Sequence, residues 1–160
     1  MRYLTIQRHA KSSWDGDEDD FNRPLNHRGA KDAPAMAQWA VDHLPPPDVV
    51  LSSSAVRART TAAEVVEAFG LAEDRFMTDE QLYLASPRTL RTAWEAVADT
   101  YAHVWLVAHN PGMTWFFNEL SSRPMDNFVT GAVAHFAWDG DSVGAGLGEL
   151  IAVQVPRELG

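Results

Sequence analysis

The sequence contains no cysteine. Without a thiol the chain cannot form a disulfide, a zinc finger or an iron–sulfur site, and it cannot use a thiolate as nucleophile. This absence excludes the cysteine-based phosphatases among other cysteine-dependent enzymes. Any nucleophile must therefore be sought among the remaining side-chain types.

Three further features are scarce or missing. The N-terminus has no signal-peptide pattern, and no apolar run is long enough to span a bilayer, which predicts a soluble cytoplasmic protein without a membrane partner. Basic residues are few, 13 Lys and Arg against 22 Asp and Glu, for a formal net charge of −9. Because that field repels nucleic acid and acidic membrane surfaces, we expect no nucleic-acid partner. An anion could bind only at a local cluster of cations.

The chain is sized for one domain. It has 160 residues, of which 46% are hydrophobic, enough for a single core. Strands and helices are predicted to alternate early, with a strand hairpin late. This order predicts a single domain over residues 1–160, a three-layer α/β/α sandwich with a mostly parallel central sheet. The expected strands are 3–7, 48–52, 75–78, 103–108, 132–138 and 149–155, and the expected helices are 26–44, 55–69, 86–101 and 113–120.

Two local features need interpretation. Pro34 falls inside the first expected helix, which predicts a kink or two shorter pieces. The acidic run Asp15 to Asp20 (DGDEDD) is typical of a solvated loop. Calcium binding is a weaker alternative for this run because the EF-hand spacing is absent.

Three strand ends carry polar groups of related chemistry. Arg8 and His9 follow the first strand, Arg57 lies in the first turn after the second, and His109 follows the strand 103–108. Carboxyl ends of parallel strands open onto one crevice, so these side chains are expected to converge. Arginine presents a planar fork of donors to phosphoryl oxygens, and a helix beginning near Ala55 could add backbone N–H groups. The pattern therefore predicts a phosphate site.

Two histidines extend this hypothesis to chemistry. A histidine with one deprotonated ring nitrogen can attack phosphorus, and a second, protonated histidine can stabilise the transferring oxygens. Alone, Arg8 and His9 would more simply be a surface ion pair and an edge histidine. Two histidines could also bind a metal, but no HExxH-type spacing exists and neighbouring arginines would repel a cation. We therefore expect no metal and no cofactor.

Four segments in this order resemble one known family. They are QRHAKSSW, RPLNHRG, SSSAVRARTTA and VAHNPGM. Together they resemble the signature motifs of the histidine phosphatase superfamily, and within it the short SixA-like phosphohistidine phosphatases. Alanine stands at Ala10 where the superfamily's RHG-type motif has glycine.

The resemblance assigns roles to individual residues. It makes His9 the nucleophile that becomes phosphorylated, with Arg8, Arg57 and His109 completing the phosphate pocket. Ser12 matches a small hydroxyl residue that can donate to phosphate. Glu80 is a candidate for the acid that protonates the leaving group, by position only.

The resemblance also sets the expected function. It implies a metal-independent phosphatase that works through a covalent phosphohistidine, and the first expected substrate is phosphohistidine carried by a protein. The alternatives are a phosphatase of a small phosphoester metabolite, such as a sugar or nucleotide phosphate, and a catalytically silent phosphate-binding module. The expected partner is accordingly a phosphorylated protein or a small phosphorylated substrate.

Overall fold

The computed structural model describes residues 1–140 and 147–159. Its centre is a six-stranded sheet with the order β3-β2-β4-β1-β5-β6. The pairs β1–β4, β2–β4 and β2–β3 are parallel, and β1–β5 and β5–β6 are antiparallel. The strands are β1 (Arg2–Arg8), β2 (Val49–Ser53), β3 (Phe76–Asp79), β4 (His103–Ala108), β5 (Val133–Trp138) and β6 (Glu149–Gln154).

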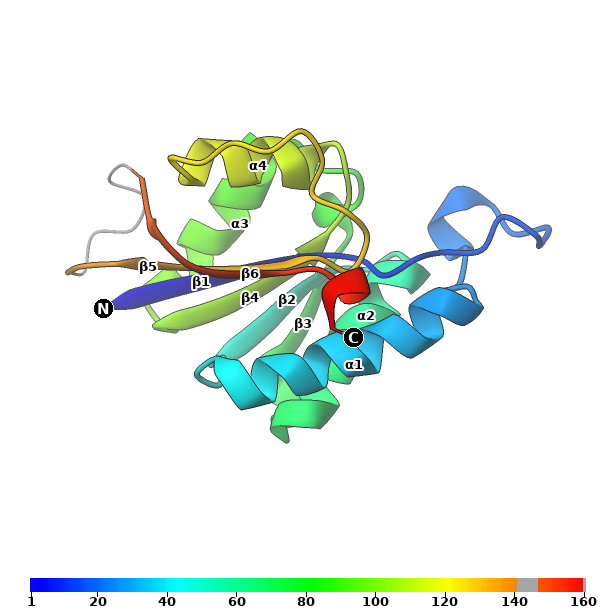
Figure 1. The fold of residues 1–160 in the computed structure, drawn as a ribbon, viewed down its shortest axis with the longest axis horizontal. Helices are drawn as coiled ribbons and strands as arrows, with labels where there is room; N and C mark the ends of the chain where they lie inside the picture. The colour runs from blue at the N-terminus through cyan, green and yellow to red at the C-terminus, as the bar shows by residue number, and fades with distance from the viewer. Residues whose placement is uncertain (141–146, 160) are drawn as a thin grey trace.

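Helices cover both faces of this sheet. Figure 1 shows α1 (His27–His43) and α2 (Val56–Phe69) on one face, and α3 (Pro87–Ala98) and α4 (Gly112–Leu120) on the other. The predicted single-domain, three-layer α/β/α architecture is confirmed. Four short 3₁₀ helices complete the described elements: η1 (Asp20–Asn22), η2 (Glu73–Arg75), η3 (Glu80–Leu82) and η4 (Pro156–Glu158). The predicted turn between the last two strands lies partly outside the described residues.

The first helix is continuous although it contains Pro34. Its N-terminus is capped by Asn26, whose side-chain oxygen accepts the Gly29 N–H at 2.8 Å. Pro34 is exposed, while the opposite stripe of the helix is buried against α2 and the sheet. The predicted division into two pieces is wrong, because burial of that stripe outweighs the hydrogen bond that proline removes.

The core lies in two layers, one on each face of the sheet. One layer joins α3 and α4 to β1, β4 and β5 through large side chains such as Trp94 and Phe117. The other joins α1 and α2 to the opposite face through side chains such as Met36 and Trp105. In residues 1–140 and 147–159, no helix is both long enough and apolar enough to cross a bilayer. The layers leave the carboxyl ends of β1, β2 and β4 open at one edge.

Candidate active site

Strand pairing brings the two predicted histidines together. In the register of β1 and β4, Arg8 lies opposite Ala108, so His9 and His109 leave the sheet side by side. The His9 N–H donates to the Ala108 carbonyl at 3.1 Å. The two imidazole centroids are 5.2 Å apart and both side chains are buried. Residues 100 positions apart thus share one site because their strands are neighbours.

The His9 ring is held in one tautomer. Its Nδ1 lies 2.7 Å from the carbonyl oxygen of Ala10, and a carbonyl can only accept, so Nδ1 carries the proton. In the neutral ring Nε2 is then the atom with the free lone pair. Burial, with the positive charges of Arg57, Arg8 and Arg23, lowers the pKa of His9 to about 3. His9 is therefore neutral near pH 7, and its Nε2 keeps a free lone pair.

The His109 ring is oriented by Ser53, at the end of β2. His109 Nε2 lies 2.8 Å from Ser53 Oγ, which also accepts the Ala55 N–H at 3.2 Å. The Ser53 hydroxyl thus connects the His109 ring to the start of α2. His109 Nδ1 is buried and has no hydrogen-bond partner. Burial and the nearby His9 lower the pKa of His109 to about 3.

Arginines surround the two rings. Arg57 is 2% exposed and Arg23 is 7% exposed, which is unusual burial for a guanidinium. Arg8 Nη1 donates to the Phe128 carbonyl at 3.3 Å. The Nε atoms of Arg8 and Arg57 are buried without a partner. Buried charged donors are costly to leave unpaired, so they mark a place where an anion would complete the hydrogen bonding.

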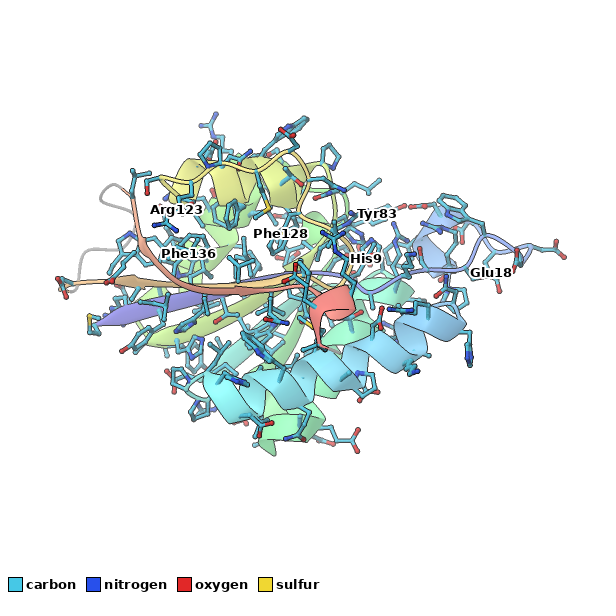
Figure 2. The ribbon with its side chains drawn as sticks, in the orientation of Figure 1. His9, Glu18, Tyr83, Arg123, Phe128 and Phe136 are labelled. Atoms are coloured by element: carbon cyan, nitrogen blue, oxygen red, sulfur yellow. The ribbon has the colours of Figure 1, made fainter. Side chains whose placement is uncertain are left out.

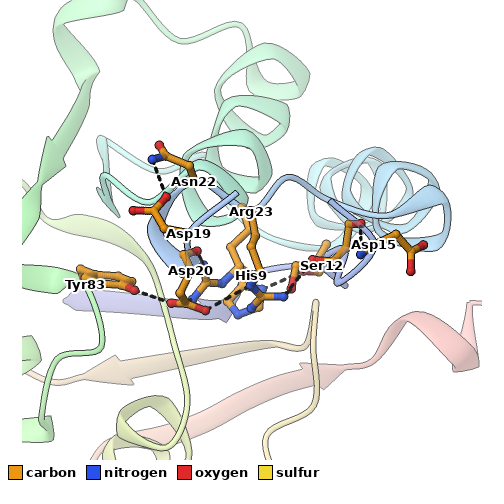
Figure 3. Close-up of polar contacts among 11 residues, drawn as sticks. His9, Ser12, Asp15, Asp19, Asp20, Asn22, Arg23 and Tyr83 are labelled. Carbon is orange, nitrogen blue, oxygen red and sulfur yellow. Dashed lines mark hydrogen bonds and ion pairs between the residues drawn. The ribbon is translucent and has the colours of Figure 1, made fainter. Parts of the chain in front are cut away.

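Asp20 ties the arginines to each other. Its carboxylate accepts from Arg57 Nη2 at 3.0 Å and from Arg23 Nε at 3.1 Å, and the Tyr83 hydroxyl also donates to it (Figure 3). The Asp20 carbonyl accepts from Arg57 Nη1 at 2.6 Å. The hydrogen bond from Tyr83, aided by those from Arg57 and Arg23, lowers the pKa of Asp20 to about 2. Asp20 is thus an ionised clamp on Arg57 and not a proton donor.

Arg23 is fixed by its other contacts as well. Its Nη1 donates to Ser12 Oγ at 2.9 Å and to the Ser13 carbonyl at 3.1 Å. Its guanidinium lies 3.4 Å from the centroid of the Trp14 ring. Ser12 therefore orients a pocket arginine, in addition to any contact that it makes with phosphate.

These groups line a cavity of about 470 Å³. Five of the six predicted site residues are among its lining residues: Arg8, His9, Ser12, Arg57 and His109. Glu80 is not: it is exposed in η3, the turn that precedes Tyr83. Asp20 is the one carboxylate among the described lining residues. The position of Glu80 gives no support to a role as acid.

Sequence reasoning missed four residues of the site. Arg23, Asp20, Tyr83 and Ser53 orient the predicted groups. Asp20 belongs to the acidic run that was interpreted as a solvated loop, which is correct for the exposed residues 15–19 and wrong for Asp20. The one signal that could have distinguished Asp20 is its position three residues before Arg23, which begins the segment RPLNHRG. Ser53 lies in the motif segment SSSAVRARTTA, although nothing there distinguished it from its serine neighbours, and Tyr83 lies in none of the four segments.

Comparisons with known proteins agree with this geometry. An uncharacterized protein of Mycobacterium tuberculosis is 32% identical, over 94% of this chain and 99% of that protein. The crystal structure of the putative phosphohistidine phosphatase SixA from Agrobacterium tumefaciens is 27% identical, with a TM-score of 0.80 over 97% of this chain and 99% of that chain. A structure of the protein histidine phosphatase SixA complexed with tungstate shares the fold, with a TM-score of 0.84 at 24% identity over 99% of both chains.

The family model agrees as well. It matches residues 4–83, which contain His9, Arg57 and the clamp residue Asp20. The family and the SixA-like neighbours support phosphatase activity. The chain belongs to the histidine phosphatase superfamily (branch 1) and is SixA-like in sequence and fold.

Proposed function

We propose that this protein removes the phosphoryl group from phosphohistidine carried by another protein, through a covalent phosphohistidine at His9 and without a metal. His9 and His109 are neutral and Arg8, Arg23 and Arg57 surround them, which suits a phosphoryl dianion. A bound dianion would raise the pKa of both rings, because an opposite charge favours the protonated form.

The His9 tautomer suits both steps of such a reaction. In the first step Nε2 attacks phosphorus, the substrate P–N bond breaks, and the protonated substrate ring leaves as neutral imidazole. The phosphorylated His9 ring keeps the Nδ1 proton, which it donates to the Ala10 carbonyl. It is therefore also a protonated phosphoimidazole, like the substrate. When water attacks phosphorus in the second step, the His9 P–N bond breaks, the ring leaves neutral, and both water protons remain with the released phosphate.

The ionised state of the Asp20 carboxylate supports phosphohistidine as the substrate. Expulsion of an alkoxide from a phosphoester needs a proton donor, which typically contributes about 10²–10⁴-fold. Asp20, with its pKa at about 2, is ionised near neutral pH and cannot supply that proton. A protonated phosphoimidazole needs no such donor. The site is therefore better matched to a P–N bond than to an alkyl phosphate, and this observation carries the proposal.

The rim of the cavity supports a protein substrate. Trp14 and Leu84 both line the cavity and are 77% and 53% exposed, so its mouth lies at the surface. Exposed apolar side chains beside a reactive site are typical of surfaces that meet another protein. A histidine side chain presented by a protein could reach the buried rings from this mouth.

The test compares two substrate classes under the same conditions. We expect kcat/KM for a phosphohistidine protein to exceed that for a sugar phosphate by at least about 10²-fold, the lower end of what a missing general acid costs. Efficient hydrolysis of the sugar phosphate with none of the phosphohistidine protein would instead establish the small-metabolite phosphatase. Binding of phosphate without turnover of either substrate would establish a silent binding module.

A further inference from the structure

A second cavity adjoins the catalytic one. It has a volume of about 400 Å³, and Arg8, Lys11 and Thr130 line both cavities. The two cavities are therefore neighbours, and a protein substrate held at His9 would extend beside the second cavity. We call the second cavity the basic groove; its charged lining residues are Arg8, Lys11, Arg28, Asp32 and Arg157.

The charge of this groove contrasts with that of the chain. Four cations and one carboxylate line it, whereas the whole chain has a formal net charge of −9. Asp32 accepts twice from Arg28 Nε, at 3.1 and 3.2 Å, and so balances one of the four cations. Among the described residues, the Lys11 and Arg157 side chains make no hydrogen bond or ion pair. The groove thus has positive charge that no residue of the described chain neutralises.

The fold places these cations with little freedom in the backbone. The Asn26 N–H donates to the Lys11 carbonyl at 3.0 Å, at the start of α1. Gly29 packs so close that a Cβ there would lie 2.0 Å from the same carbonyl oxygen. The turn η4, which carries Arg157, lies against α1 near the C-terminus (Figure 1). Lys11, Arg28 and Arg157 thus come from three segments held together by packing.

We propose that the basic groove binds a carboxylate side chain of the phosphorylated protein, close to its phosphohistidine. The inference rests on the proposed function and specifies its substrate as a protein with acidic residues beside the phosphohistidine. The Arg28 side chain is 58% exposed, and Lys11 and Arg157 are exposed as well. Such exposed cations attract an acidic surface and fix its orientation, whereas a small ligand would need the desolvated, paired donors found around His9.

The experiment uses two synthetic phosphohistidine peptides of equal length. One has Glu and Asp flanking the phosphohistidine, and the other has Gln and Asn at the same positions. We expect wild-type kcat/KM to be about fivefold higher for the acidic peptide, because of a lower KM. An effect of this size is what two exposed ion pairs contribute. The preference should shrink as salt is added, because exposed charges are screened. It should become much smaller in the double variant Arg28→Gln/Arg157→Gln, which keeps Lys11 and Arg8 in the groove.

Two controls separate the groove from general effects. Turnover of phosphoramidate, which has a P–N bond but no carboxylate, should be equal in wild type and the double variant. The variant Arg88→Gln/Arg123→Gln removes the same charge from exposed residues of α3 and the segment after α4, and should keep the peptide preference. Figure 2 shows Arg123 well away from His9, toward the far end of the sheet. Loss of the preference in this control would overturn the assignment to the groove.

A binding measurement distinguishes failure of the inference from failure of the proposed function. Fluorescence anisotropy with the unphosphorylated peptides should show tighter binding of the acidic one to wild type, and a much smaller difference between the two for Arg28→Gln/Arg157→Gln. Equal binding to wild type would overturn the groove even if phosphohistidine is hydrolysed. Absence of turnover with the binding preference retained would overturn the proposed function alone. A groove-dependent preference for a sugar bisphosphate over a sugar monophosphate, with no preference between the peptides, would overturn the proposal that the groove binds a protein carboxylate.

Discussion

Two pairs of histidines lie along the same central strands and differ in how their polar atoms are used. His9 and His109 follow β1 and β4, where the arginines gather. His103 begins β4 and His135 lies in β5, and both contact Thr5 of β1. The ring centroids of the second pair are 5.1 Å apart, close to the 5.2 Å of the first. Proximity of two buried histidines is therefore not what makes a site.

Hydrogen bonds within the protein satisfy the polar atoms that join His103, Thr5 and His135. His103 Nδ1 donates to the Pro46 carbonyl at 3.1 Å, so its Nε2 accepts from the Thr5 hydroxyl at 2.7 Å. Thr5 Oγ1 in turn accepts from His135 Nδ1 at 2.7 Å. No side-chain atom of these three residues is both buried and unpaired, whereas His109 Nδ1, Arg8 Nε and Arg57 Nε are. Buried polar atoms left unpaired beside two guanidinium groups distinguish a site prepared for an anion from a structural cluster.

The largest contrast between the pairs should appear on removing His9. We expect His9→Ala to lower turnover by about 10⁴-fold or more, because the covalent route has no substitute. Trapping with a labelled phosphodonor should give an acid-labile phosphate on wild type and none on the variant. His135→Ala is the matched control: it should lower stability while the folded fraction still forms the phosphoenzyme. Label on a carboxylate or serine would refute the mechanism.

The His103–His135 pair should make the free energy of unfolding fall in acid. An unfolded histidine has a pKa of about 6.5, whereas burial lowers the pKa of His103 and of His135 to about 4 in the folded protein. Between these values the unfolded state binds more protons, so this contribution to stability is complete above about pH 6.5 and is lost as pH falls toward 4. At pH 5 the upper limit is about 2 kcal/mol per histidine.

Urea midpoints at pH 7 and pH 5 would measure this loss. Imidazole NMR resonances check the folded state directly: the rings of His103 and His135 should not titrate between pH 7 and pH 5. Buried rings that titrate near pH 6.5 would remove the basis for the acid effect.

A smaller effect is expected at Arg57, where charge is kept and geometry is changed. Both of its terminal nitrogens contact Asp20, and lysine cannot reproduce this fork. We expect Arg57→Lys to lower kcat/KM by about 10²-fold, comparable with the loss of one preorganised donor. Arg59→Lys, at an exposed position on the same helix, is the control and should be unchanged. Wild-type kinetics in Arg57→Lys would show that Arg57 does not hold the phosphoryl group.

The two histidine pairs also show what the sequence could predict. The alternation of strands and helices predicted the layers, and the positions of Arg8, His9, Arg57 and His109 after strands predicted their convergence. The Thr5 cluster was not foreseen, because no local pattern records that β5 adds antiparallel to β1 and brings His135 opposite Thr5. The clamp by Asp20 was missed for a related reason: its partners, Arg57 and Tyr83, are 37 and 63 residues away. Contacts set by tertiary packing leave no periodic signal in the chain.

The hydrogen bonds of the His103–His135 pair can be removed without changing a residue of the active site. Thr5→Val keeps the shape of the side chain but leaves His103 Nε2 and His135 Nδ1 without their partner. We expect a loss of about 1–3 kcal/mol in the free energy of unfolding, the usual cost of unpaired buried polar groups. Phosphatase turnover at a temperature where the variant is folded should be unchanged. Thr60→Val, at an exposed position of α2, is the control for the substitution itself. A drop in kcat with unchanged stability would show that the two pairs are coupled.

The smallest expected effect is that of a chelator, which should leave turnover unchanged. Magnesium supplies positive charge to the transferring phosphoryl group in many phosphotransfer enzymes. Here Arg8, Arg23 and Arg57 line the cavity with His9, and Asp20, the described carboxylate beside them, already accepts from Arg23, Arg57 and Tyr83. A divalent cation would have to displace those donors and approach a cluster of guanidinium groups, which is electrostatically unfavourable. Turnover of a phosphohistidine protein should therefore be equal before and after dialysis against EDTA. Loss of activity that magnesium or manganese restores would contradict this expectation, and it would mean that the arginines orient the substrate while a metal neutralises its charge.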